Sequence, residues 1–193
     1  MNFLAHFHLA WPDEGLVAGG LEGDYYKGPL RGDLPRDIER GVQLHRAIDA
    51  YTDGHPLIQQ LRRDLPQSLR RYAGILIDLS FDHYLSRHWS TFSDIPLRTF
   101  NDQVYRTLSA HKSALSDGSR TMLARMVEFD ILGLYVDWEA VPASAARVGS
   151  ASSATTRCRM STVNCRRQGT RWSRHFWLST PSWKPSARVM CDD

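Results

Sequence analysis

The chain has 193 residues, of which 42% are hydrophobic, and its formal net charge is +3. This length can bury one sizeable core, and no run of eighteen apolar residues is present, which argues against a membrane span. The N-terminus has no basic region before its apolar residues, and the three cysteines fit neither a disulfide framework nor a zinc motif. We therefore expect a cytoplasmic protein without a signal peptide.

Helix-like patterning recurs along residues 1–140. A run of five predicted helices covers residues 36–53, 55–65, 66–89, 93–111 and 116–138. Pro35 and Ser116 are typical residues at helix starts, and apolar residues in the last segment recur at steps of three and four. Since no segment alternates with period two, we predict an all-α, compact helical bundle of about six helices.

Composition and charge change near residue 140. Residues 141–193 contain eight Arg, one Lys and two Asp, about +7, which leaves about −4 for residues 1–140. This second segment is rich in Ser, Thr and Arg, and its tryptophans follow no period. We predict a helical domain over residues 1–140 and an atypical tail over 141–193, which is either disordered or out-of-frame sequence.

The predicted helix over residues 36–53 carries a row of titratable side chains. His45, Asp49 and Asp53 are spaced at i, i+4 and i+8 and therefore lie on nearly one face. The neighbouring apolar stripe, which includes Val42 and Ile48, has to face the core. The polar row consequently borders the interior, as a functional site would.

The predicted helix over residues 66–89 is apolar on almost every side, which indicates a central position. It carries Asp78, Asp82 and His83, and an isolated buried carboxylate costs several kcal/mol unless it is paired, hydrogen-bonded or bound to a metal. Asp78 is compatible with a structural pairing to Arg46 or Arg71 as well as with a site role. Asp82 and His83 together favour a ligand role.

Two histidines near the N-terminus complete the candidate site. His6 and His8 point away from each other because they are two residues apart, so at most one is expected to bind a ligand. Asp24 lies in a Gly-rich turn, where an aspartate is usually only a turn residue, and it becomes a candidate ligand because of the other clusters. Histidine nitrogen and aspartate oxygen without cysteine suit a divalent hydrolytic metal centre, whereas no Walker loop, dinucleotide fingerprint or Gly-x-Ser-x-Gly motif occurs.

Four segments, "MNFLAHFHLA", "GGLEGDYYKG", "GVQLHRAIDAYTDGHP" and "RRYAGILIDLSFDHYLSRHW", closely resemble the acyl carrier protein phosphodiesterases in order and separation. The resemblance covers about residues 1–138, and the tail departs from it. It implies an all-helical fold related to the HD-domain metal phosphohydrolases. It also implies hydrolysis of the phosphodiester that joins 4′-phosphopantetheine to a serine of holo acyl carrier protein. This reaction would depend on Mn²⁺ or on another divalent metal such as Mg²⁺ or Fe²⁺.

The resemblance also implies roles for matching positions. The metal ligands it suggests are His6, Asp24, His45 and Asp82. Asp49 and His83 would orient these ligands or the attacking water, and Arg46 or Lys27 would offset charge on the phosphoryl group.

Carrier proteins of this kind are acidic, so we expect a basic docking patch. The candidates are Arg62, Arg63, Arg70 and Arg71, although a solvated helix face would have the same composition. No nucleic-acid recognition motif accompanies the arginines of the tail, and no oligomeric state is predicted. Two other functions stay open: an HD-type phosphohydrolase for a small nucleotide or phospholipid, and a non-catalytic helical scaffold.

Overall fold

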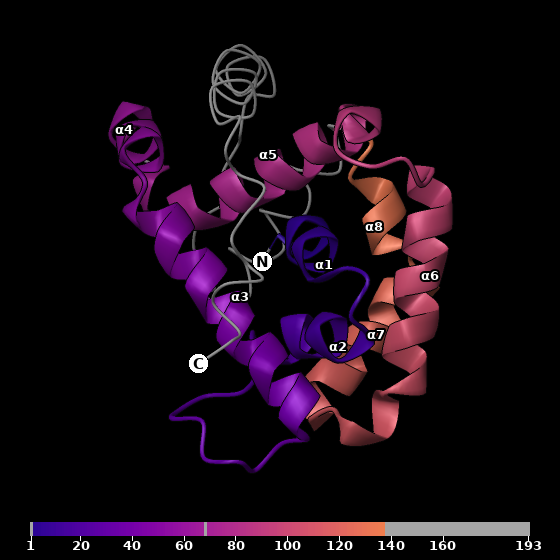
Figure 1. The fold of residues 1–193 in the computed structure, drawn as a ribbon. Helices are drawn as coiled ribbons and strands as arrows, with labels where there is room; N and C mark the ends of the chain where they lie inside the picture. The colour runs from indigo at the N-terminus through magenta and orange to yellow at the C-terminus, as the bar shows by residue number, and fades with distance from the viewer. Residues whose placement is uncertain (1, 68, 138–193) are drawn as a thin grey trace.

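The computed structural model describes residues 2–67 and 69–137, which form eight α-helices and no strand (Figure 1). The predicted all-α class is therefore confirmed. The helices are α1 (Phe3–Ala10), α2 (Glu14–Glu22), α3 (Arg36–Gly54), α4 (Pro56–Asp64), α5 (Ala73–Arg87), α6 (Leu97–Ala110), α7 (Asp117–Glu128) and α8 (Ile131–Leu134). Short 3₁₀ turns occupy Arg70–Tyr72, Trp89–Thr91 and Lys112–Ala114. The segment predicted as a tail, 141–193, lies outside these residues.

The structure contains more helices than the about six expected, for two reasons. The apolar N-terminal run forms two separate helices, α1 and α2. The prediction of one helix over residues 116–138 is wrong, because Asp130 adopts a left-handed conformation with φ 45°, which ends α7 and precedes α8. The Asp130 carboxylate accepts hydrogen bonds from Arg98 (2.8 Å) and Tyr105 (3.1 Å), which stabilise this break.

Several helix boundaries follow from side-chain caps. Ser116 accepts a hydrogen bond from the backbone N–H of Ser119 at the start of α7, as its position predicted. His55 separates α3 from α4, and its Nδ1 accepts the N–H of Leu57 (3.3 Å). His55 therefore lies at the end of α3 and caps the start of α4.

Helix α1 lies in the middle of the molecule, between α3 on one side and α6 and α8 on the other (Figure 1). It contacts α2, α3 and α5, and its side chains from Phe3 to Phe7 are all buried. Because most of α1 is buried, the side chain of His6 lies among core residues. Within the described residues, no helix combines the length and apolar character that crossing a membrane requires.

Helices α2 and α3 make the most extensive helix contact, and glycines allow their backbones to approach closely. A Cβ atom added at Gly19 would collide with the carbonyl oxygen of Ile38 and the Cα of Gly41. Only residues without side chains fit at this crossing. The crossing fixes the loop after α2 against the middle of α3, where the candidate site is found.

Candidate metal centre

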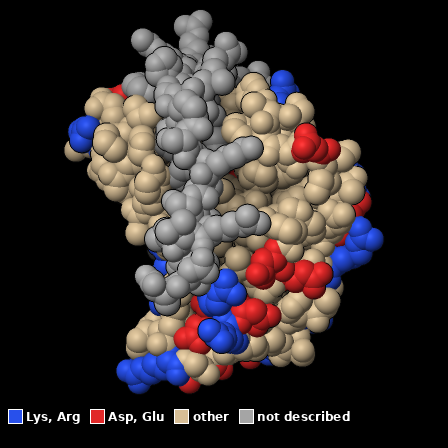
Figure 2. Space-filling model, viewed as in Figure 1, with Lys and Arg blue, Asp and Glu red and all other residues tan. Residues whose placement is uncertain are grey.

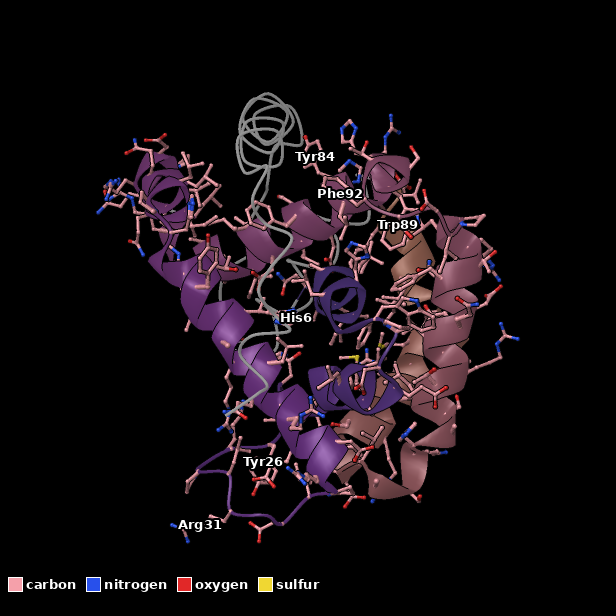
Figure 3. The ribbon with its side chains drawn as sticks, in the orientation of Figure 1. His6, Tyr26, Arg31, Tyr84, Trp89 and Phe92 are labelled. Carbon is pink, nitrogen blue, oxygen red and sulfur yellow. The ribbon has the colours of Figure 1, made fainter. Side chains whose placement is uncertain are left out.

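Three of the predicted site residues converge where α1 meets α3. His6 Nε2 lies 3.2 Å from Asp49 Oδ1, and His45 Nε2 lies 3.3 Å from Asp49 Oδ2. The two imidazole rings stack with their centroids 4.3 Å apart. One ligand atom from each of the three residues lies within 4.8 Å of the others, so the group is compact enough to hold a metal ion. Figure 3 shows His6 in the interior of the molecule, facing α3.

The two histidines are buried, whereas Asp49 opens the site to solvent. His6 and His45 are 3% and 5% exposed, and the Asp49 side chain is 53% exposed. His6 Nδ1 donates to the carbonyl oxygen of Asn2 (3.0 Å), which directs Nε2 toward the carboxylate. Within the described residues, His6 Nε2 has no aligned hydrogen-bond partner. A buried imidazole nitrogen without such a partner, facing a carboxylate, fits a metal-ligand position.

The carboxylate and the imidazoles perturb each other's protonation. Burial lowers the pKa of His6, but the adjacent Asp49 carboxylate, with smaller contributions from the Asn2 carbonyl and Asp82, more than offsets this, so the pKa is raised above its usual value. Burial raises the pKa of Asp49, but His45 and His6 together hold that pKa well below the usual range. Asp49 is therefore ionised at neutral pH and supplies negative charge to the group.

Asp24 lies next to this group, at the end of α2. Its Oδ1 is 3.9 Å from His45 Nε2, and its side chain is 20% exposed. Gly23 makes the approach possible, because a Cβ atom there would overlap the imidazole of His45. Asp24 therefore offers a fourth donor, a carboxylate oxygen, beside the two histidines and Asp49.

Lys27 and Arg46 donate hydrogen bonds to backbone carbonyl groups of the loop that carries Asp24. Lys27 Nζ donates to the carbonyl oxygen of Asp24 (2.6 Å), and Arg46 Nη2 donates to that of Tyr26 (3.0 Å). Arg46 extends from α3 and thus attaches the loop to the helix that holds His45. Both cations lie beside the site, and both hold the loop in place.

The structure places Asp82 behind the three-residue group rather than in it. Asp82 is fully buried on α5, and its two carboxylate oxygens accept the backbone N–H groups of Leu4 (3.1 Å) and Ala5 (3.0 Å). The N–H groups in the first turn of a helix have no partner within the helix, and Asp82 supplies one for these two. The helix dipole also favours negative charge at this end of α1. Burial raises the pKa of Asp82 to about 7, although both N–H groups lower it. The predicted role of Asp82 as a metal ligand stays a prediction, and its contacts position the turn that carries His6.

His83 faces the other side of α5, toward the end of α8. Its Nδ1 donates to the carbonyl oxygen of Tyr135 (2.8 Å). The hydroxyl of the same tyrosine hydrogen-bonds to the Asp82 side chain, and burial together with Asp82 raises the pKa of Tyr135 well above its usual value. Two consecutive residues of α5 therefore hold Tyr135, which links the end of α8 to the start of α1.

Sequence reasoning missed Gly23 and Tyr135. Gly23 could have been found, because a glycine directly before a candidate ligand often permits a close approach. Tyr135 is 52 residues from His83 and carries no motif that predicts the contact. The other N-terminal histidine, His8, packs its ring against Trp89, with centroids 5.0 Å apart, and so lies outside the group, as expected for one of the pair.

A buried histidine pair with an ionised carboxylate, presented by helices, is a donor set of the kind that divalent metal centres use. A family model described as "Acyl carrier protein phosphodiesterase" matches residues 1–182, and the chain belongs to this family. The resemblance found from four segments is thereby confirmed. The matched range extends beyond residue 138 and includes most of the segment that composition set apart.

Curated relatives agree with the family model. Proteins named acyl carrier protein phosphodiesterase from Shigella boydii serotype 18 (strain CDC 3083-94 / BS512) and from Escherichia coli (strain K12 / DH10B) are each 43% identical to the chain over 101 residues. The aligned region covers 52% of this chain and 52% of each relative, so the chain spans about half the length of the curated relatives it matches. No solved structure matches the chain.

Proposed function

We propose that the chain is a metal-dependent phosphodiesterase that hydrolyses the link between 4′-phosphopantetheine and a serine of holo acyl carrier protein. The observation that carries the proposal is the compact group of His6, His45 and Asp49 in a chain of this family. Relatives named for this activity support the substrate. Both the reaction and the protein substrate are proposals for this chain.

In this proposal His6 Nε2, His45 Nε2 and the Asp49 carboxylate hold Mn²⁺, or another divalent metal such as Mg²⁺ or Fe²⁺. Asp24 is the fourth donor, since its carboxylate lies beside His45. Asp49 thus takes a ligand position, and Asp82 fixes the first turn of α1, directly before His6, through the backbone N–H groups of Leu4 and Ala5. The metal would lower the pKa of a bound water and neutralise charge on a phosphoryl oxygen.

The residues of the chain have separate tasks in the hydrolysis. Water adds to phosphorus, the bond between phosphorus and the serine oxygen breaks, and the serine oxygen takes up a proton. The products are apo carrier protein and free 4′-phosphopantetheine. In this proposal the ionised, half-exposed Asp49 carboxylate binds the metal through one oxygen, and its other oxygen orients the attacking water from the solvent side. Arg46 and Lys27 hold the loop and add positive charge beside the phosphoryl group.

We also propose kinship with the HD-domain metal phosphohydrolases. The supporting features are the all-helical fold and a donor set of histidine and aspartate taken from two helices. His83 is not proposed to contact the phosphodiester, since its Nδ1 is bonded to the end of α8.

The test is mass spectrometry of holo acyl carrier protein after incubation with the purified chain, with Mn²⁺ or with a chelator. We expect metal-dependent loss of the 4′-phosphopantetheine mass, abolished in Asp49→Asn and retained in Asp53→Asn. Asp53 is a matched control because it lies one turn further along the same face of α3 and pairs with Arg62 instead (2.6 Å).

Two results would contradict the proposal. A folded, metal-loaded chain that cleaves a small phosphodiester but not the carrier protein would favour a small-substrate phosphohydrolase. A folded chain that binds no divalent metal would favour a non-catalytic scaffold. Equal activity of Asp49→Asn and Asp53→Asn would remove Asp49 from the mechanism.

A further inference from the structure

A hollow lies where α4, the following turn and the start of α5 meet. Figure 1 shows α4 at one corner of the molecule. It encloses about 380 Å³ and is lined by Gln59, Arg62, Arg63, Arg70, Ala73 and Gly74. Two of the six residues have small or no side chains and leave room between the three arginines. The lining therefore combines three cationic side chains and one neutral polar side chain with two small residues.

Two of the three guanidinium groups carry charge that the described residues do not neutralise. Arg62 is paired with Asp53. Arg63 donates to the neutral side-chain oxygen of Gln60 (3.0 Å), and Arg70 donates to the carbonyl oxygens of Leu65 (3.2 Å) and Arg63 (3.0 Å). Carbonyl oxygens orient a guanidinium group but leave its net charge in place. The hollow thus presents fixed positive charge to an incoming ligand.

The loop between α2 and α3 has a different charge distribution from the hollow. Figure 2 shows acidic and basic side chains mixed around the loop between α2 and α3, where charges compensate one another. Arg71, predicted with the other three arginines, does not line the hollow, and its guanidinium lies over the ring of Tyr72, 4.7 Å from the centroid. The docking residues predicted from sequence are thus divided by the structure into three that share a hollow and one that does not.

The hollow is connected to the candidate metal centre along α3. Asp53 follows Asp49 by one helical turn, about 6 Å along the axis. Arg62, which lines the hollow, is bonded to Asp53. A ligand in the hollow and a phosphodiester at Asp49 would therefore lie on adjoining parts of one surface.

We propose that this hollow receives acidic side chains of the carrier-protein substrate while its phosphodiester occupies the metal centre. The proposal rests on the proposed function and identifies where that substrate is held. Carboxylates are the ligands that guanidinium groups bind most specifically, through paired N–H donors. The hollow and the metal centre occupy adjoining but separate parts of the surface, so a ligand that engages both is larger than a single phosphodiester, as a protein substrate is.

The test is the substitution Arg63→Glu, which reverses the charge of an exposed side chain whose hydrogen bond to Gln60 lies at the surface. Arg106→Glu is the matched control, since Arg106 is an exposed arginine on α6, far from α4 across the molecule (Figure 1). With holo carrier protein we expect KM to rise about tenfold in Arg63→Glu with kcat unchanged, and the difference to shrink between about 20 mM and about 500 mM salt. Hydrolysis of bis(4-nitrophenyl) phosphate should be equal in all three proteins.

Calorimetric binding of apo carrier protein, which has no phosphodiester to cleave, separates this proposal from the proposed function. Binding that Arg63→Glu weakens and Arg106→Glu does not would support the docking site even if no hydrolysis occurred. Hydrolysis and binding that are unaffected by Arg63→Glu would overturn the docking site and leave the proposed function intact. If the wild-type chain neither binds nor hydrolyses the carrier protein, both proposals fail.

Discussion

Asp82 makes a measurable prediction about stability because it is a fully buried carboxyl group. Burial raises its pKa from the ordinary 3.8 to about 7. Between these values the folded chain keeps a proton that the unfolded chain has lost, so the free energy of unfolding falls as pH rises. The slope is about 1.4 kcal/mol per pH unit for one proton. Over the whole window the Asp82 carboxyl should therefore lower the free energy of unfolding by about 4 kcal/mol.

The substitution Asp82→Asn tests this, because asparagine has nearly the same shape and does not ionise in the window. Urea unfolding of the metal-free protein, followed by circular dichroism at several pH values from about 4 to about 8, gives the free energy of unfolding. The curve of Asp82→Asn should fall by about 4 kcal/mol less than the wild-type curve. The raised pKa of His6 also lowers stability toward higher pH; Asp49, present in both proteins, contributes more to that rise than Asp82 does. Parallel curves for the two proteins would refute the assignment of a proton to buried Asp82.

Two further predictions concern the metal centre and the packing beneath it. Mn²⁺ affinity, measured by calorimetry, should fall as pH is lowered through the raised pKa of His6, because a proton competes for the nitrogen that faces Asp49. A Mn²⁺ affinity that does not change with pH would exclude His6 as a ligand. Gly19→Ala should lower the free energy of unfolding by about 2–4 kcal/mol, because its Cβ would collide with the backbone of Gly41. Gly74→Ala is the control, since open space surrounds that position, and equal effects of the two substitutions would contradict the packing argument.

Helix prediction from the sequence succeeded where apolar residues recur with a helical period and polar residues mark the ends. The bounds of α3 were expected at 36–53 and are Arg36–Gly54, with Pro35 before the first residue. It failed where no periodicity exists: α1 is apolar on nearly every side, and its residues were assigned to no helix. The break at Asp130 was also hidden, because a non-glycine residue with positive φ has no reliable signal in the local sequence.

The candidate site was predictable to the extent that it lies on one helix. His45 and Asp49 are four residues apart on α3, and this spacing alone placed them together. The spacing could not show that His6 stacks on His45, because that contact depends on how α1 crosses α3. Nor could it show that the Asp82 carboxylate faces the first turn of α1, since a buried acid has the same signature whether it binds a metal or caps a helix.

These contacts explain why a carboxyl group that lowers stability at neutral pH is useful at this position. One proposed metal ligand, His6, belongs to an eight-residue helix, and so short a helix is held in place mainly by its packing. Asp82 fixes the first turn of that helix through two hydrogen bonds, and Tyr135 in turn contacts Asp82. A shift of about 1 Å in α1 would misplace His6 relative to His45 by a similar distance, which is enough to weaken a metal site. We therefore infer that buried Asp82 holds α1 in the position that keeps the His6 imidazole stacked on that of His45.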